Sequence, residues 1–248
     1  MRTRKLKSRK RRLDQVLLDL GLAESRHQAQ GLIMAGRVRI AGQVFDKAGA
    51  ATGPDVDIVV EAGPTYVSRG GLKLAHALDH FGLDVRGLRV VDVGASTGGF
   101  TDCLLQRGAV HLYAVDVGRG QLHERLRRDD RVTLMERVNA HAPFELPGEV
   151  EMAVIDVSFI SLTKVMPNVL RHLKRGQHLL GLVKPQFEAG REQVGRGGVV
   201  RDPMVHGQVL AESVVWAVRA GLRLRGIMAS PIEGDKGNRE FFVLLEQV

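Results

Sequence analysis

Four charged residues stand in or beside segments that otherwise read as buried strands or tight turns. They are Lys73 in SRGGLK, Asp156 in IDVSFI, Lys184 in LVKPQF and Glu240 in GNRE. A charge in such a place is costly to bury without a partner, and each one alone would more often belong to a surface ion pair. Together they form a set of two lysines and two carboxylates, in which a positioned lysine can stabilise an oxygen that is losing its proton.

A second candidate site is a glycine-containing turn that follows the apolar run 90–93. The turn consists of Gly94, Ala95, Ser96, Thr97, Gly98, Gly99 and Phe100. Asp116 ends the next apolar run, 22 residues after Gly94, where a carboxylate can accept hydrogen bonds from both hydroxyls of a ribose. This spacing indicates a cofactor that contains a nucleoside. The turn is GASTGG and not GxGxxG, which disfavours NAD. The alternative for Gly98 and Gly99 is tight packing of a helix on a strand.

The elements around these residues alternate between strands and helices. Continuous apolar runs predict strands at 90–93, 111–115, 132–135, 152–155 and 179–183, with a closing strand at 240–246. Helices are expected at 100–106, 120–127, 162–173 and 203–220. Apolar runs between helices are typical of strands that are covered on both faces. We therefore predict a doubly wound, Rossmann-like α/β domain over 68–248.

The N-terminal part has a different pattern, typical of a small α+β module over residues 13–60. Apolar spacing predicts helices at 13–20 and from about Ser25 to Gly36, and short strands at 37–40, 44–45 and 57–60. Residues 61–67 read as a linker. Ser68 can cap a third helix, whose expected buried stripe is Leu74, Ala77, Leu78 and Phe81.

The positive charge of the chain is concentrated at its N-terminus. The net charge is +8, and residues 1–12 hold eight of the 36 basic residues and no acid. The rest of the sequence carries 28 basic and 28 acidic residues and is neutral. Such a basic arm favours contact with the phosphates of a nucleic acid over a merely solubilising end.

The N-terminal module resembles the alpha-L RNA-binding fold seen in ribosomal small-subunit protein four, on the string RLDQVLLDLGLAESRHQAQGLIMAGRVRIAGQV. The resemblance implies that basic residues of the two helices face RNA. The matching positions are Arg12, Arg26, Arg37 and Arg39, and Arg4 belongs to the preceding arm. The simpler alternative is that these arginines only solvate a surface.

The whole chain resembles the TlyA family of rRNA methyltransferases, which joins such a module to an FtsJ-like domain. The strings VSRGGLKL, GASTGGF, DVSFISL, LVKPQFE and GGVVRDP carry the resemblance. It implies methyl transfer from S-adenosylmethionine to a ribose 2′-hydroxyl, of cytidine, in rRNA of the large and possibly the small subunit. Thr97 stands where the simpler FtsJ pattern has proline. Asn139, at the expected adenine contact, stands where aspartate is usual.

Carried over residue by residue, the resemblance makes Lys73, Asp156, Lys184 and Glu240 the catalytic positions. In-line transfer needs mainly alignment, so we expect a charged Lys184 to orient and stabilise the acceptor oxygen. Asp156 and Glu240 would fix Lys184, and Lys73 would hold the ribose or a phosphate. Arg69 and Phe159 are further candidates for RNA contact. Phe159 and Phe187 could each stack on a base or pack in the core. No metal site is expected.

Other functions stay open at this stage. A degenerate enzyme domain would make the protein an RNA-binding assembly factor, although all four catalytic positions are filled. Relatives of the TlyA family carry haemolysin names, but the sequence has no apolar stretch of about 18 residues that could span a membrane. The single cysteine, Cys103, cannot form an internal disulfide, and a cytoplasmic location is expected. Oligomeric state and the target nucleotide are not predicted.

Overall fold

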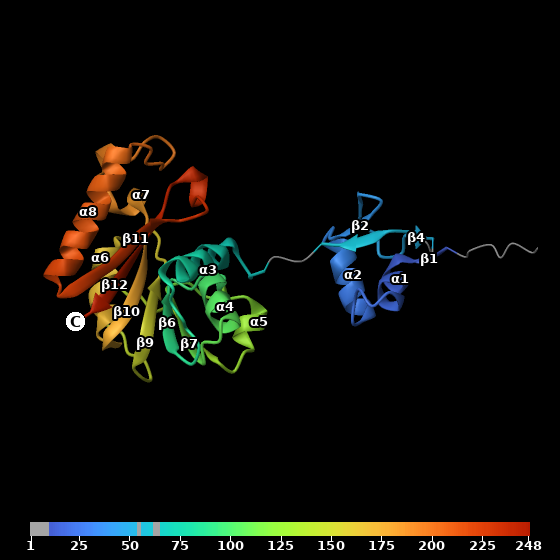
Figure 1. Cartoon of the computed structure of the whole chain (residues 1–248), viewed down its shortest axis with the longest axis horizontal. Helices are drawn as coiled ribbons and strands as arrows, with labels where there is room; N and C mark the ends of the chain where they lie inside the picture. Colours follow the sequence, from blue (N-terminus) through green and yellow to red (C-terminus); the bar gives the residue numbers. More distant parts are fainter. Residues whose placement is uncertain (1–9, 54–55, 62–64) are drawn as a thin grey trace, which may run out of the picture. The chain divides into compact units, whose positions relative to one another are not determined.

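The computed structural model describes residues 10–53, 56–61 and 65–248. The chain divides into two compact units, Met1–Thr65 and Tyr66–Val248 (Figure 1), and each is taken by itself below. Arg4 and most of the expected basic arm lie outside the described residues. Among the described residues, no helix is long and apolar enough to cross a membrane.

The first unit places two helices on a small antiparallel sheet. The helices are α1 (Leu13–Asp19) and α2 (Arg26–Met34). The sheet has the order β3 (Gln43–Phe45), β2 (Val38–Ile40) and β5 (Ile58–Val60). Its buried core comprises Leu13, Leu17, Ala23, Ala29, Ile33, Val38 and Ile40. The helices and strands lie close to where the apolar spacing predicts them.

A two-stranded ladder in this unit was not expected. Strand β1 (Arg11–Arg12) pairs antiparallel with β4 (Ala51–Thr52). The last two residues of the expected arm are therefore part of the folded module. A strand of two exposed arginines has no apolar alternation, so the sequence pattern gives no sign of it.

The second unit is built on a seven-stranded sheet with the order β11-β12-β10-β9-β6-β7-β8. In chain order its strands are β6 (Arg89–Val93), β7 (His111–Asp116), β8 (Val132–Glu136), β9 (Val150–Ile155), β10 (Leu173–Val183), β11 (Leu222–Ala229) and β12 (Phe241–Gln247). Neighbours pair in parallel from β8 to β10, whereas β12 runs antiparallel to both β10 and β11. The start of β12 therefore lies at the same edge as the carboxyl ends of the parallel strands.

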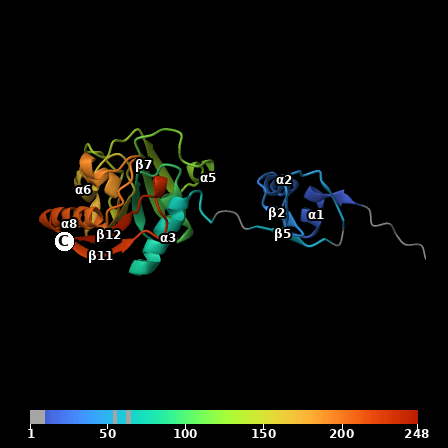
Figure 2. The same cartoon turned by 90° about the horizontal axis from the view of Figure 1, so that it is seen from above.

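Helices cover both faces of this sheet, as the sequence predicts (Figures 1 and 2). Successive residues of β6 show the two layers. Val90 packs in a core with α3 (Arg69–Phe81), α4 (Gly99–Gln106) and α5 (Glu124–Arg127), and Val91 packs in one with α6 (Leu162–Leu170) and α8 (Pro203–Arg219). A further short helix, α7 (Pro185–Glu188), lies against α8.

Several details differ from the sequence expectations. Tyr66 and Val67, expected in the linker 61–67, belong to the second unit, where Tyr66 packs in the core. Helix α5, expected over 120–127, begins only at Glu124. Strand β11 was not predicted, because Gly226 interrupts the alternation in LRLRGIMA and the register with β12 shifts there. A side chain at Gly226 would meet the ring of Phe81. Helix α6 ends at Leu170, and β10 begins as early as Leu173. Ser68 is the N-cap residue of α3, but its side chain makes no capping hydrogen bond.

Candidate functional site

Three adjoining cavities lie along the carboxyl edge of the parallel strands. The first, about 350 Å³, is lined by the ends of β6, β7 and β9 and by the loop at Asn139. The second, about 250 Å³, lies between the start of α3 and the glycine turn. The third, about 390 Å³, holds Lys184 and Glu240. Asp156 lines the first and second cavities, and Lys73 lines the second and third. The four charged positions therefore meet where the cavities join.

The four charges form two ion pairs. Lys184 Nζ lies 2.6 Å from Asp156 Oδ1, and Lys73 Nζ lies 2.5 Å from Glu240 Oε2. Lys73, Lys184 and Glu240 are buried. The expectation that Asp156 and Glu240 both fix Lys184 differs from this arrangement, because Glu240 pairs with Lys73 on α3. Each buried charge has a partner, which offsets the cost of its desolvation.

Ser158 is a contact of this site that the sequence interpretation did not single out. Its hydroxyl accepts a hydrogen bond from Lys184 Nζ at 2.9 Å. Ser158 lies two residues after Asp156 in the loop that follows β9, so one loop supplies both polar contacts of Lys184. The sequence feature that could have indicated Ser158 was its position close to Asp156, at the end of a predicted strand.

The glycine turn is shaped by close approaches within the protein. Gly94 has φ +88°, and a Cβ there would lie 2.3 Å from the carbonyl oxygen of Asp156. Gly98 has φ +95°, and a Cβ would meet Leu126 at 2.3 Å. A Cβ at Gly99 would lie 2.2 Å from Ser68 Oγ. Packing thus accounts for glycine at 98 and 99. Every turn residue except Gly98 lines the first or second cavity.

Asp116 and Asn139 both line the first cavity. Asp116 is anchored by two backbone amides, since Oδ2 accepts from Ser96 N at 2.7 Å and Oδ1 from Gly118 N at 2.6 Å. A carboxylate oxygen can accept a second hydrogen bond, so Asp116 can still bind hydroxyls. Asn139 Oδ1 accepts from His141 N at 3.1 Å, which leaves the amide group available as a donor.

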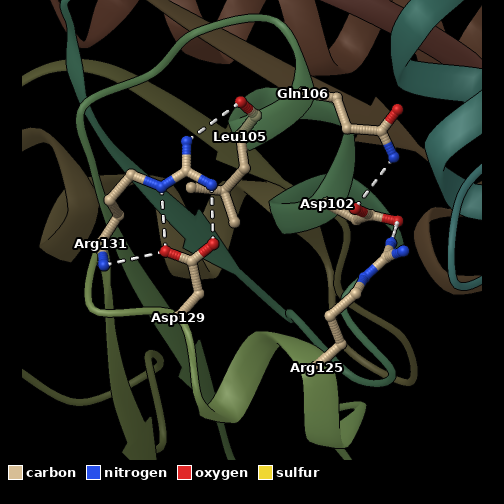
Figure 3. Close-up of polar contacts among 6 residues, drawn as sticks. All are labelled: Asp102, Leu105, Gln106, Arg125, Asp129 and Arg131. Atoms are coloured by element: carbon tan, nitrogen blue, oxygen red, sulfur yellow. Dashed lines mark hydrogen bonds and ion pairs between the residues drawn. The ribbon is translucent and has the colours of Figure 1, made fainter.

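A polar network behind the turn ties α4 to α5 (Figure 3). The buried carboxylate of Asp102 accepts from Arg125 at 2.7 Å, Gln106 at 3.1 Å and the backbone amide of Val67 at 2.8 Å. Arg131 binds Asp129 through two side-chain nitrogens and the Leu105 carbonyl through a third. These bonds hold the helix that begins at the glycine turn.

Phe159 and Arg69 are exposed at the cavity rims. Phe159 is 90% exposed and has a left-handed backbone with φ +64°, so packing in the core does not explain it. Its ring centroid lies 5.0 Å from that of Phe187. Arg69 begins α3 and lines the second cavity, and its side chain forms no hydrogen bond or ion pair with another described residue.

The four candidate RNA-binding arginines that the structure describes in the first unit have acceptors within the unit. Arg12 and Arg26 bind the fully buried Asp14 at 2.9 and 3.1 Å, and the bond from Arg12 is the main cause that holds the pKa of Asp14 well below its usual range. Arg37 donates to the Glu61 carbonyl, and Arg39 pairs with the Glu61 carboxylate. These side chains thus have structural contacts besides any with RNA.

Asp92 is a buried acid beneath the turn that no motif had indicated. Its Oδ2 accepts a hydrogen bond from Thr101 Oγ1 at 2.6 Å, and its Oδ1 has no hydrogen-bond partner among the described residues. Burial raises the pKa of Asp92 to about 7; the Thr101 bond opposes this rise, and the charges of Asp156 and Asp116 add to it.

The raised pKa of Asp92 predicts a pH-dependent stability. The folded chain keeps this proton up to about pH 7, whereas the unfolded chain releases it near the ordinary value of 3.8. The free energy of unfolding attributable to Asp92 should therefore fall as pH rises from about 4 to about 7. We expect Asp92→Asn to gain stability relative to wild type across this range in urea denaturation. The exposed control Asp130→Asn should show no such gain. If the free energy of unfolding depended on pH equally in both variants, the assignment to Asp92 would be contradicted.

Two family models match the chain, and together they span nearly all of it. The model of the FtsJ-like methyltransferase matches residues 66–247, which is nearly all of the second unit and includes the three cavities described above. The model of the S4 domain matches residues 11–51, within the first unit. No group of three or more potential metal-binding His, Cys, Asp or Glu side chains occurs in the part of the chain that the structure describes.

Three similar proteins cover most of the chain. The 16S/23S rRNA (cytidine-2′-O)-methyltransferase TlyA of Mycobacterium tuberculosis is 44% identical over 242 residues, 96% of this chain and 90% of its own. YqxC of Bacillus subtilis, provisionally named an rRNA methyltransferase, is 48% identical over 96% of this chain and 86% of its own. A solved structure from Streptococcus thermophilus with a provisional hemolysin name has 44% identity and a TM-score of 0.73, covering 97% of this chain and 90% of its own.

Proposed function

The chain belongs to the TlyA family of FtsJ-like methyltransferases, and on that premise we propose that it methylates the ribose 2′-hydroxyl of a cytidine in ribosomal RNA. The observation that carries the proposal is the junction of the three cavities at the Lys73–Glu240 and Lys184–Asp156 pairs. A relative with 44% identity is named for this reaction on both 16S and 23S rRNA. The cytoplasm, where ribosomes are modified, is the proposed location.

The first two cavities fit S-adenosylmethionine as the methyl donor. The anchored carboxylate of Asp116 suits the ribose hydroxyls, and the amide of Asn139 suits the adenine edge. The backbone of Gly94 lines both cavities. The cofactor supplies an activated methyl group. The third cavity is then the place for the acceptor nucleotide, with Phe159 available to stack on its base.

Lys184 is best placed to act on the acceptor oxygen. Its ammonium group is held between Asp156 Oδ1 and Ser158 Oγ, so its position is fixed before substrate binds. A fixed positive charge stabilises the developing alkoxide and orients it for in-line attack. Lys73, held by Glu240, lies on the border of the second and third cavities and there positions the ribose or a neighbouring phosphate.

The cofactor assignment can be tested at Asp116. S-adenosylmethionine should raise the melting temperature of the wild-type protein by mass action, and NAD should not. Asp116→Ala should lose most of this shift, because the ribose hydroxyls lose their acceptor. Differential scanning fluorimetry with and without ligand measures both effects. An undiminished shift in the variant would remove Asp116 from the site.

The first unit and the basic arm are proposed to bind RNA. Because Arg11 and Arg12 belong to the folded module, the informative truncation removes residues 1–9 only. This deletion should weaken RNA affinity and reduce its dependence on salt, since fewer phosphates are neutralised, while affinity for S-adenosylmethionine stays unchanged. Filter binding at several salt concentrations measures the slope; an unchanged slope would place the arm outside the interface.

Methyl mapping of rRNA decides between this function and its alternatives. A cytidine 2′-O-methyl group should appear in rRNA only when the protein is present. An RNA-binding assembly factor would leave the methylation pattern unchanged. A membrane-active haemolysin would release dye from liposomes that contain no other protein.

A further inference from the structure

A fourth cavity, of about 250 Å³, lies beside the proposed active site. It is formed by the segment that leads into α8 and by the loop before β12. Two arginines line it, Arg201 and Arg239, together with Pro203 at the start of α8, the buried His206 and the exposed Glu233. The His206 ring contacts the Val200 carbonyl at 2.9 Å, which fixes one wall of the cavity.

The two arginines of this cavity have no acid partner in the described part of the chain. Neither Arg201 nor Arg239 makes a hydrogen bond or ion pair with its side chain among the residues that the structure describes. Arginines elsewhere in the second unit commonly do, as Arg225 does with Glu246 and Arg89 with Glu151. Glu233 is the only carboxylate among the lining residues, so the cavity keeps an excess of positive charge.

The fourth cavity shares a wall with the third. Asn238 joins the two segments that form this wall, since its Nδ2 donates to Gly198 O at 2.9 Å and its Oδ1 accepts from Val200 N at 3.1 Å. Asn238 and Glu240 line the third cavity, whereas Arg239 between them lines the fourth. Neighbouring residues of one short segment therefore line both cavities.

We propose that this fourth cavity binds a backbone phosphate of the RNA strand next to the nucleotide in the third cavity. The proposal rests on the proposed function, which places the acceptor nucleotide there. Guanidinium groups match phosphate oxygens in charge and geometry. A strand whose target ribose lies at Lys184 has its adjacent phosphates on either side, and the shared wall brings this pair of arginines beside one of them.

The test compares two double variants that remove the same charge. Arg201→Ala/Arg239→Ala should lower the affinity of the full-length protein for unmethylated large ribosomal subunits roughly tenfold. It should also reduce the slope of log affinity against log salt by about one. The control Arg175→Ala/Arg219→Ala removes two exposed arginines that lie away from the site and pair with no described residue, and it should change neither quantity. Arg201→Lys/Arg239→Lys should recover most of the affinity, because a phosphate also accepts a point charge.

Binding is measured without S-adenosylmethionine, so a failure of methyl transfer is read separately in the methylation assay. Equal losses in the cavity variant and the control would overturn the proposal. A second result would also overturn it. Inorganic phosphate would raise the melting temperature of the wild type and not that of the cavity variant, while the two proteins bound RNA equally well. The cavity would then hold a free anion. Unchanged thermal shifts with S-adenosylmethionine in all variants would show that the fold and the cofactor site are intact.

Discussion

Lys184→Ala should reduce the rate of methyl transfer about 10²–10³-fold or more while leaving the binding of RNA and S-adenosylmethionine nearly unchanged. The ammonium group is held by Asp156 and Ser158, and in the proposed mechanism it acts on charge that develops only in the transition state. Removing it therefore affects the chemical step. Single-turnover transfer of a tritiated methyl group, with separate binding measurements, distinguishes the two effects.

A second lysine that pairs with a carboxylate offers a matched control for this variant. Lys174 lies near the start of β10 and pairs with Glu151 at 2.8 Å, whereas Lys184 directly follows the last residue of that strand. Lys174→Ala should leave the transfer rate close to wild type. A Lys184→Ala enzyme that keeps its single-turnover rate, or one that loses cofactor binding to the same degree, would contradict the assigned role.

Replacing the target nucleotide by its 2′-deoxy form should abolish methylation. The proposed acceptor is the 2′-hydroxyl, and the lysine–carboxylate pairs suit the activation of an alcohol. The 2′-hydroxyl is also the group by which a protein distinguishes RNA from DNA at a given position. Once the target is mapped, an rRNA fragment with one deoxy substitution serves as substrate, and tritium incorporation measures transfer.

A fragment with the deoxy substitution at the neighbouring nucleotide is the control, and it should be methylated at close to the normal rate. Methylation of the target-substituted fragment at the normal rate would exclude the 2′-oxygen as acceptor. The enzyme would then modify a base, and the two ion pairs would need another explanation.

The sequence predicts the layers of the second unit well because continuous apolar strands and amphipathic helices leave periodic patterns. It also places Asp156 and Lys184 at the same edge of the sheet, since each follows a strand. Glu240 reaches this edge only because β12 runs antiparallel to β10, which the apolar pattern does not show. The sequence could not predict which lysine pairs with which acid, because α3 and the start of β12 are far apart in the sequence. Ser158 and Asp92 were missed because their roles depend on contacts across loops and on complete burial.

The arginines show a different limit of sequence interpretation. Arg12, Arg26, Arg37 and Arg39 read as an RNA surface, yet each binds an acceptor within the first unit. Arg201 lies in GGVVRDP and Arg239 in GNRE, but the sequence did not single out either arginine, and neither side chain has a partner among the described residues. The sequence shows where a charged residue stands, but only the structure shows whether a partner within the protein already neutralises its charge.

The position of β12 bears on how the protein is made. This strand follows β11 in the chain, yet it lies between β10 and β11 in the sheet. During translation, β11 cannot join the sheet until β12 has emerged, and Glu240, just ahead of β12, cannot reach Lys73 before then. Pairing across 167 positions of sequence is slow relative to local contacts. In nascent chains, the half of the domain proposed to bind the cofactor should therefore fold first. The proposed active site should stay incomplete until β12 has been inserted.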